Sequence, residues 1–444
     1  MKKKVLSMLL VMNILGIALS GCGDSASDDA AKASDNSQKE ETTEQSKATT
    51  ETETETSTET VTVKVLMSAG WTEDAIDAIR PQLKEKGIEL DIEAYDSATY
   101  EGKQRLACSS KGGEYDVVFL PGNVVNTYAN AGALIPMNDV VEDMGFTDDD
   151  YYDSVRKFTK VGDDWYVVPF SAECMVYFYR TDLISEDQVP TTIDEMYELG
   201  KSLTNGDTYG CAIPAQSGEA ACSMWSYFLW SYGGDYFDEN WYPTLNTPEA
   251  VEAAEMFAKI DQDCAPEGIT TWQDEETIAA FQNGQIASMV IWPGYWGMLS
   301  DPEQCKVYDK IGVAPVPAGP NGARPRFGTW GVGVTANCKN VEAAKEVVKE
   351  YCNKENMSAR LDLCPSAVKE VNEVENAQEI NYTLPANCTS LDTADERPPI
   401  PEINSYISAV GAAINSVIAG NPAQEVMDAV NEEVKGIMEE AGYY

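Results

Sequence analysis

Hydrophobic periodicity begins abruptly at residue 61. Three β-branched or aromatic runs at residues 61–67, 88–92 and 115–120 predict buried strands. Between the first two, Thr72 precedes two acidic residues and a spaced apolar series, which predicts a helix capped at Thr72 that continues through Leu83. Strands that alternate with helices indicate an α/β domain with a mostly parallel sheet.

The middle of the chain carries more helical signals. Thr192 and Glu195 have the spacing of a capping box, and Thr247 stands directly before a proline that suits a first helical position. Hydrophobic patterns then predict strands over 166–170, 175–179, 286–291 and 331–334, and closing helices over 341–352, 403–418 and 423–438.

The first 60 residues lack this pattern. Residues 23–60 contain no aromatic residue and no Val, Ile, Leu or Met, so we expect a solvated tether. Before it, three lysines, an apolar run over 5–18 and the sequence Leu19-Ser20-Gly21-Cys22 have the order of a secretory signal peptide. The apolar run is shorter than the roughly 20 residues that span a bilayer, which disfavours the alternative of an uncleaved anchor helix. We predict a signal peptide over 1–21, a tether over 22–60 and a folded domain over 61–444.

Composition excludes several kinds of site. Acidic residues outnumber basic ones 74 to 31, for a net charge of −43, which argues against nucleic acid as a partner. The chain has no histidine, which removes Ser-His-Asp catalysis and the commonest zinc ligands. Its 11 cysteines form no Cys-x-x-Cys pair, so we expect no metal and no cofactor, and mostly reduced thiols.

Two resemblances extend this interpretation. The residues up to Cys22 resemble bacterial lipoprotein signals, which implies that Cys22 is lipidated and holds the protein at the outer side of the membrane. From about residue 61 to residue 438, the chain resembles the maltose-binding-like extracellular solute-binding proteins of sugar ABC importers. The segments that carry this resemblance are 115–118, 128–136, 165–169, 177–183, 190–196, 232–234, 245–250 and 281–287.

The second resemblance implies an α/β, two-lobed, type II periplasmic-binding-protein-like fold with discontinuous lobes joined by a hinge. We expect lobe 1 to comprise about 61–170 and 293–335, and lobe 2 about 171–292 and 336–444. The implied function is non-catalytic: a monomer that binds a mono- or oligosaccharide between the lobes and delivers it to the permease subunits.

A sugar site needs aromatic faces for C–H surfaces and polar side chains for hydroxyl groups. Glu173 is a candidate because a carboxylate between two apolar strands is costly to bury without a partner. The resemblance and the positions after predicted strands extend the set of ligand contacts to Trp71, Asn123, Glu173, Trp225, Trp292, Tyr295, Trp330 and Tyr406. A hinge or surface role is open for Trp71, a turn role for Asn123, and a helical-core role for Trp225 and Tyr406. Arg324 and Arg326 could instead grip a charged ligand.

Three alternatives stay open at this point. The same fold could bind a polyamine, although Glu173 is the sole acidic residue among the candidates. An exported glycoside hydrolase would need two carboxylates roughly 5–9.5 Å apart, and no strand-end motif suggests such a pair. A purely structural or adhesive surface protein would lack a ligand cleft.

Overall fold

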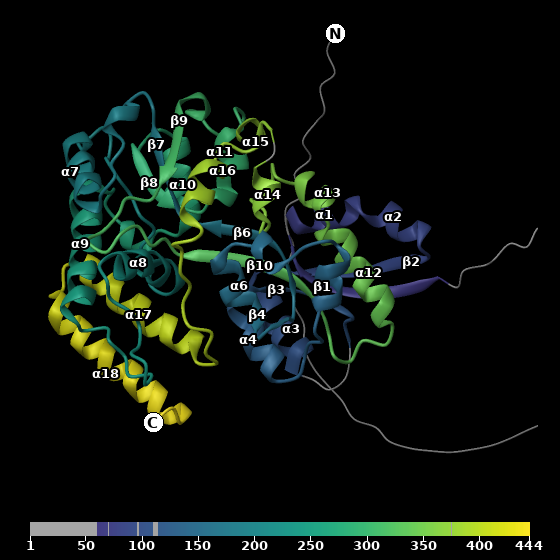
Figure 1. Cartoon of the computed structure of the whole chain (residues 1–444). Coiled ribbons are helices and arrows are strands. Elements are labelled where there is room, and N and C mark those ends of the chain that lie inside the picture. Colours follow the sequence, from purple (N-terminus) through teal and green to yellow (C-terminus); the bar gives the residue numbers. More distant parts are fainter. Residues whose placement is uncertain (1–59, 70, 96, 110–113, 374) are drawn as a thin grey trace, which may run out of the picture. The chain divides into compact units, whose positions relative to one another are not determined.

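The computed structural model describes residues 60–444, apart from 70, 96, 110–113 and 374 (Figure 1). The predicted signal peptide, Cys22 and residues 22–59 of the predicted tether lie outside the described residues, as does the side chain of Trp71. The described part falls within one compact unit that runs from Thr58 to Tyr444. None of its helices has the length and apolar character needed to cross a membrane.

The first sheet has five strands in the order β2-β1-β3-β10-β6. They are β1 (Val61–Ser68), β2 (Ile88–Tyr95), β3 (Val117–Pro121), β6 (Val168–Cys174) and β10 (Phe327–Val334). The strands β2, β1 and β3 are parallel, whereas β10 is antiparallel to both β3 and β6. Four of the five strands, β2, β1, β3 and β6, therefore run in one direction, which confirms the mostly parallel sheet that was predicted, and β10 enters it from a distant part of the chain in the opposite direction.

Both faces of this sheet are covered. In β1, Val63, Val65 and Met67 contribute to one hydrophobic core, and Leu66 contributes to a smaller core on the opposite face. Alternate residues of a strand point to opposite faces, so a nearly continuous apolar run is what a doubly covered strand requires. The predicted strand at 61–67 is confirmed.

Eleven helices among the described residues accompany this sheet, and the last of them also contacts a strand of the second sheet. They are α1 (Trp71–Ala78), α2 (Arg80–Glu85), α3 (Ser97–Ser109), α4 (Gly122–Asn130), α5 (Asn138–Asp143), α6 (Asp153–Thr159), α12 (Val341–Cys352), α13 (Lys354–Ser358), α14 (Lys369–Asn372), α15 (Ala377–Ile380) and α16 (Leu384–Ser390). A small ribbon of β4 (Lys160–Val161) and β5 (Asp164–Trp165) lies apart from the main sheet.

The single helix predicted from Thr72 to Leu83 is in fact two helices. Pro81 lies in the first turn of α2, where its missing N–H is tolerated, whereas the interior of a longer helix would not tolerate it. Thr72 does not cap a helix: it lies inside α1, and its hydroxyl donates to the Ser68 carbonyl at 2.7 Å.

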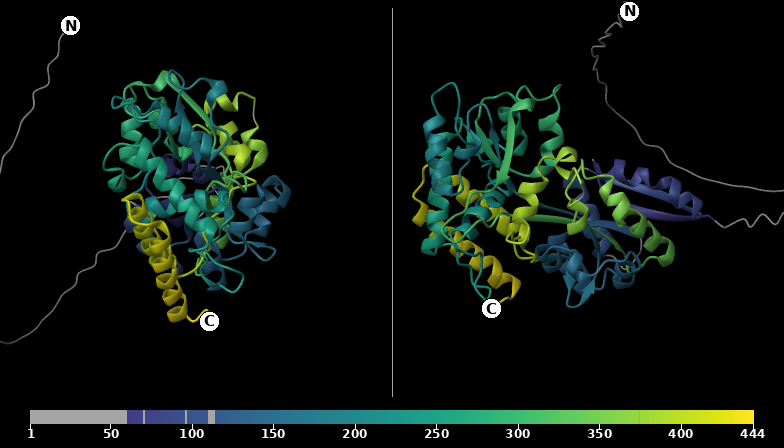
Figure 2. Two further views of the ribbon diagram at one scale, coloured as in Figure 1. Left: turned by 90° about the vertical axis from the view of Figure 1, so that its left-hand side faces the viewer. Right: turned by 45° about the horizontal axis from the view of Figure 1, so that its top comes forward.

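The second sheet is antiparallel, in the order β8-β7-β9. Its strands are β7 (Val176–Arg180), β8 (Ser288–Ile291) and β9 (Ile311–Pro315). The helices around it are α7 (Ile193–Leu203), α8 (Glu219–Ser231), α9 (Pro248–Cys264), α10 (Asp274–Gln282), α11 (Trp296–Ser300), α17 (Ile403–Ile418) and α18 (Ala423–Ala441). Figures 1 and 2 show α17 and α18, in yellow, side by side, with the C-terminus at the far end of α18.

Two local predictions for the helices of this part are confirmed. Thr192 accepts a hydrogen bond from the Glu195 amide, and the Glu195 side chain accepts one from the Thr192 amide, so the capping box is formed. Thr247 caps α9 directly before Pro248. The three predicted closing helices are α12, α17 and α18, of which α18 extends three residues further than expected.

Two large hydrophobic cores define a first and a second lobe. The first core takes residues from 63–174 and 327–394, and the second mainly from 175–316 and 400–438. This division differs from the predicted one. Residues 311–315 belong to the second lobe because β9 pairs with β7, and α12 belongs to the first because it packs on β6 and β10. The chain crosses between the cores three times, and the ten cysteines of the described part carry free thiols.

Candidate functional site

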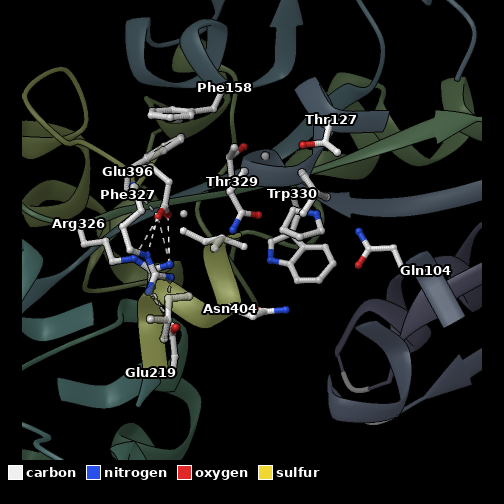
Figure 3. Close-up of a pocket in the computed structure, with 18 of the residues that line it drawn as sticks. Gln104, Thr127, Phe158, Glu219, Arg326, Phe327, Thr329, Trp330, Glu396 and Asn404 are labelled. Carbon is white, nitrogen blue, oxygen red and sulfur yellow. Dashed lines mark hydrogen bonds and ion pairs between the residues drawn. The ribbon is translucent and has the colours of Figure 1, made fainter. Parts of the chain in front are cut away.

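A cavity of about 720 Å³ opens between the two cores. Ser68 and Pro121 line it from the ends of β1 and β3. Trp330 lines it from β10, and Asn404 lines it from the start of α17 (Figure 3). The ends of strands in open α/β sheets are where ligands usually bind, and this volume is in the range of small-molecule sites. Of the eight predicted ligand contacts, Asn123, Glu173, Trp292 and Trp330 line this cavity.

Glu173 lies in β6, opposite Gly328 of β10. Burial raises the pKa of Glu173 to about 7, and a hydrogen bond from the Gly294 amide opposes part of that rise. A β-carbon at position 294 would lie 3.2 Å from Glu173 Oε2, so a glycine allows this close approach. Glu173 is therefore a desolvated acid at the wall of the cavity, able to accept hydrogen bonds when ionised and to donate one when protonated.

Because Glu173 is desolvated, the free energy of unfolding should depend on pH. Because its pKa is near 7 in the folded chain against 4.5 as the ordinary value, the folded state binds more protons between these values, and stability falls as pH rises through this window. We expect Glu173→Gln to match the parent near pH 4.5 and to exceed its free energy of unfolding at pH 8 by up to about 3 kcal/mol. Urea unfolding of both proteins at pH 4.5, 6 and 8 measures this difference; a difference that is constant across pH would contradict the prediction.

Three polar atoms in the cavity wall have no hydrogen-bond partner. They are the Tyr100 hydroxyl, the Gln104 amide nitrogen and the Asn123 amide oxygen. Buried polar atoms are nearly always hydrogen-bonded, so these three lining side chains keep hydrogen-bonding capacity for a ligand that both donates and accepts, once they turn toward the cavity. Asn123 was predicted from its place after a strand, whereas Gln104, seen at one side of the cavity in Figure 3, was not.

Two tryptophan rings supply apolar surface. Trp330 lies in β10 between Pro121 of β3 and Ser171 of β6, and its ring centroid is 6.0 Å from that of Tyr100. Trp292 lies directly after β8. A β-carbon added at Gly328 would lie 3.5 Å from the Trp292 ring, so this ring borders Gly328 of β10. Flat aromatic faces next to unpaired amides are the combination that a sugar or polyol requires.

A cluster of four charged side chains forms another part of the wall. Arg397 contacts both carboxylate oxygens of Glu219 at 2.8 Å, and Arg326 contacts Glu219 at 3.3 Å and Glu396 at 3.2 Å. Burial alone would raise the pKa of Glu219, but the two arginines hold it below its ordinary value. With two positive and two negative groups, this ion cluster (Glu219, Arg326, Glu396 and Arg397) is balanced in charge. Figure 3 shows it on the side of the cavity opposite Gln104.

Tyr295 lies in an adjoining cavity of about 130 Å³, which shares Glu219, Trp292 and Arg326 with the larger one. Its hydroxyl donates to Asp274 at 3.2 Å. Burial raises the pKa of Asp274 to about 6, and the hydrogen bond from Tyr295 opposes this rise. Among the residues that the structure describes, no group of three or more Cys, Asp or Glu side chains is arranged to hold a metal ion.

Two predicted ligand contacts, Trp225 and Tyr406, belong to the second core and not to the site. Trp225 and Tyr406 have no exposed surface and do not line either cavity. Trp225 lies in α8, whose residues 221–231 are all buried, and its ring contacts Tyr236 at 5.8 Å between centroids. Tyr406 packs edge-on against the same tyrosine at 4.9 Å. Both rings pack against Tyr236 inside the second core and have no exposed surface, so the helical-core alternative holds for both.

Tyr406 offers a direct test of this correction. Its hydroxyl is buried without a hydrogen-bond partner. We expect Tyr406→Phe to leave ligand affinity unchanged and to stabilise the protein by about 1 kcal/mol, because the variant removes an unsatisfied polar group and keeps the ring. Urea unfolding and ligand titration of the variant measure the two effects. A large loss of affinity with intact folding would restore Tyr406 to the site.

The ion cluster is the part of the site that could not be predicted from the sequence. Arg326 was noted as a possible grip for a charged ligand, but its carboxylate partners at 219 and 396 lie far from it along the chain and in no motif. A signal exists only in retrospect: Glu396-Arg397 is a charged pair directly before the proline-rich stretch 398–401. Tyr100 and Gln104, on α3, are four residues apart and hence on one helix face.

Comparison with known proteins places the chain among binding proteins. A probable amino-acid ABC transporter periplasmic-binding protein from Sinorhizobium fredii is 27% identical over 271 residues, or 60% of this chain, and the chain spans 61% of that relative's length. The galactooligosaccharide-binding protein of Bacillus subtilis is 26% identical over 72% of this chain and 76% of its own.

Solved structures agree in fold. An ABC transporter solute-binding protein from Agrobacterium radiobacter K84 in complex with ribitol superposes with a TM-score of 0.74 at 24% identity, over 85% of this chain and 99% of that one. Maltose-bound MalE3 of T. maritima gives 0.73 at 21% identity with the same coverage. These likenesses establish the two-lobed type II fold. Residues 67–357 match the family described as bacterial extracellular solute-binding protein, and the chain belongs to that family.

Proposed function

We propose that this protein is the lipid-anchored, extracellular substrate-binding component of an ABC importer, which captures a neutral carbohydrate or polyol in the 720 Å³ cavity. The observation that carries the proposal is the set of three unpaired polar atoms, on Tyr100, Gln104 and Asn123, in a wall that also holds Trp292 and Trp330. Hydroxyl groups of a sugar can pair with these side chains once they turn toward the cavity, and its C–H faces can cover the rings.

The charges in the wall favour a neutral ligand. Of the three arginines that line the cavity, Arg326 and Arg397 are already paired with carboxylates, which leaves the exposed Arg105 of α3 as the lining arginine that could receive the carboxylate of an amino acid. A polyamine would need several unpaired acids, and of the three carboxylates among the described lining residues, two are in the ion cluster. Glu173 is the third, and a single desolvated acid suits a hydroxyl group as well as an amine.

Capture would be reversible and would use the three crossings between the lobes as a hinge. Closure around a ligand removes water from its hydrogen bonds, which strengthens them. Family membership supports binding without catalysis, which sets the glycoside hydrolase alternative aside. Relatives named as ABC transporter binding proteins support permease subunits as the partner. The anchor through Cys22 and the monomeric state rest on the sequence prediction.

A thermal-shift screen of residues 58–444 tests the ligand class. The panel contains ribitol, mannitol, maltose and galacto-oligosaccharides, with amino acids and spermidine as the competing classes. A ligand at 100 times its dissociation constant stabilises the folded state by about 2.7 kcal/mol, which moves the melting temperature by several degrees. A shift with sugars or polyols alone supports the proposal. A shift with amino acids or spermidine alone contradicts it, and so does no shift across the panel.

A further inference from the structure

An exposed group of aromatic side chains lies on the second lobe outside both cavities. It consists of Phe237, Trp241, Tyr242, Tyr443 and Tyr444, hereafter the aromatic platform. Trp241, Tyr242 and Tyr444 are 36%, 44% and 37% exposed, which is unusual for large rings on a protein surface. None of the five residues is needed for the cavity described above.

The loop that carries the platform is held firmly by its own hydrogen bonds. Phe237 and Pro243 form an antiparallel bridge. Within it, the Asp238 amide donates to the Tyr242 carbonyl at 2.8 Å, and the Asp238 carboxylate accepts from the amides of Asn240 and Tyr242 at 2.8 and 2.9 Å. The exposed rings therefore stand on a defined turn.

Trp241 has a backbone conformation that a bulky residue rarely adopts. Its φ is +66°, in the left-handed region that glycine and asparagine tolerate best. Among the described residues, the other non-glycine with positive φ is Asn376, which is one of the tolerant types. A tryptophan kept in a strained conformation, with its ring at the surface, points to a use for the ring.

The rings are arranged in pairs with acceptors beside them. Tyr242 and Tyr444 stack with centroids 4.1 Å apart and planes 17° apart, and Trp241 contacts Tyr443 at 5.4 Å. Asp238 and Glu439 lie close enough to raise the pKa of Tyr444, although burial is the larger cause. Flat apolar rings bordered by carboxylates match the C–H faces and hydroxyls of sugars, and the negative charge disfavours an anionic partner.

The platform is continuous with the cavity wall through α17. The Tyr443 hydroxyl donates to Glu402 at 3.2 Å, directly before α17, and Phe237 contacts Tyr406 within that helix. Ile403 and Asn404, at the start of the same helix, line the cavity. A sugar chain that leaves the cavity along the start of α17 would meet the platform next.

We infer that the aromatic platform is a second carbohydrate site, which holds units of a neutral oligo- or polysaccharide outside the cavity. The inference takes its ligand class from the proposed function. It adds a role in gathering long chains at the protein surface, so that a free end or a released fragment is close to the cavity.

Affinity electrophoresis in native gels that contain amylopectin, xylan, galactan or mixed-linkage β-glucan tests the platform. We expect at least one polysaccharide to retard the parent protein, and Trp241→Ala and Tyr242→Ala each to weaken that retardation at least five-fold. Tyr308→Ala is the matched control, because Tyr308 is 45% exposed and lies outside the platform. No retardation of the parent by any of the four polysaccharides overturns the inference, as does equal retardation of the platform variants.

A second measurement separates the platform from the cavity. The platform variants should retain the thermal shift with the small ligand found in the screen, whereas Trp330→Ala should lose that shift and keep the retardation. A positive small-ligand shift without retardation therefore overturns the platform alone. Platform variants that fail to bind permease subunits, in a protein that no polysaccharide retards, would assign the surface to a protein partner and overturn the inference as well.

Trp241→Asn distinguishes a binding role from a structural one. Asparagine adopts the left-handed conformation with less strain, so we expect an equal or higher melting temperature together with weaker retardation. A lower melting temperature with unchanged retardation would show that Trp241 serves the fold, and would overturn its part in the site.

Discussion

Trp330→Ala is expected to weaken binding of the cavity ligand about 100-fold, which corresponds to about 2.7 kcal/mol. The ring lies at the centre of the cavity wall, at the meeting point of β3, β10 and β6, and next to the unpaired Tyr100 hydroxyl. Removal of a central aromatic contact typically costs 2 kcal/mol or more, because both its contact area and its exclusion of water are lost. Isothermal titration with the ligand found in the thermal-shift screen measures the change.

Two further variants make this result specific. Trp330→Phe keeps a ring in the same place, so its affinity should lie between those of the parent and the alanine variant. Trp272→Ala is the matched control, because Trp272 is a partly buried tryptophan of the second lobe that lines neither cavity. An equal loss of affinity in Trp272→Ala would mean that the effect comes from general destabilisation and that Trp330 is not a ligand contact.

Arg397→Met is expected to lower the free energy of unfolding by about 3–5 kcal/mol. The Arg397 side chain is 2% exposed, and it donates to both oxygens of Glu219 as well as to Glu396, which is itself 6% exposed. Methionine has a similar length but no charge, so the variant leaves Glu396 buried with fewer partners. Urea unfolding at neutral pH measures the loss.

A surface pair gives the matched control for this variant. Lys354 contacts Glu370 at 2.8 Å, but both side chains are about half exposed, so Lys354→Met should cost less than about 1 kcal/mol. If the two variants lose the same amount, the ion cluster behaves as an ordinary surface pair and its place in the cavity wall is not a structural requirement.

Helix starts and strands could be predicted from the sequence wherever the interactions that form them involve neighbouring residues. The capping box at Thr192 and the Thr247-Pro248 helix start are of this kind, because all the interacting atoms lie within one turn. The strand at Val61 is equally local, since its β-branched, apolar run favours an extended conformation. Family resemblance then supplied the two-lobed arrangement that local patterns lack.

What the sequence could not supply depends on contacts between distant segments. The division of the lobes differed from the prediction because the partner of β9 is β7 and the helix α12 packs back on the first sheet. The predicted ligand contacts also depended on such distant packing, and some of them proved to be core residues. Trp292 and Trp225 are both tryptophans in apolar surroundings, yet one lies at a cavity wall and the other in a core, and only the packing of α8 against α17 decides this.

The antiparallel strand β10 also governs the order in which this chain can fold. Thr335, just after β10, donates to the carbonyl of Tyr115, which precedes it by 220 positions. The first sheet therefore has an unpaired edge at β3 until most of the polypeptide has been synthesised, and contacts of such long sequence separation form slowly. An emerging N-terminal segment would expose the apolar strand β3 throughout that interval, which makes it a natural substrate for chaperones and delays completion of the first sheet until β10 is available.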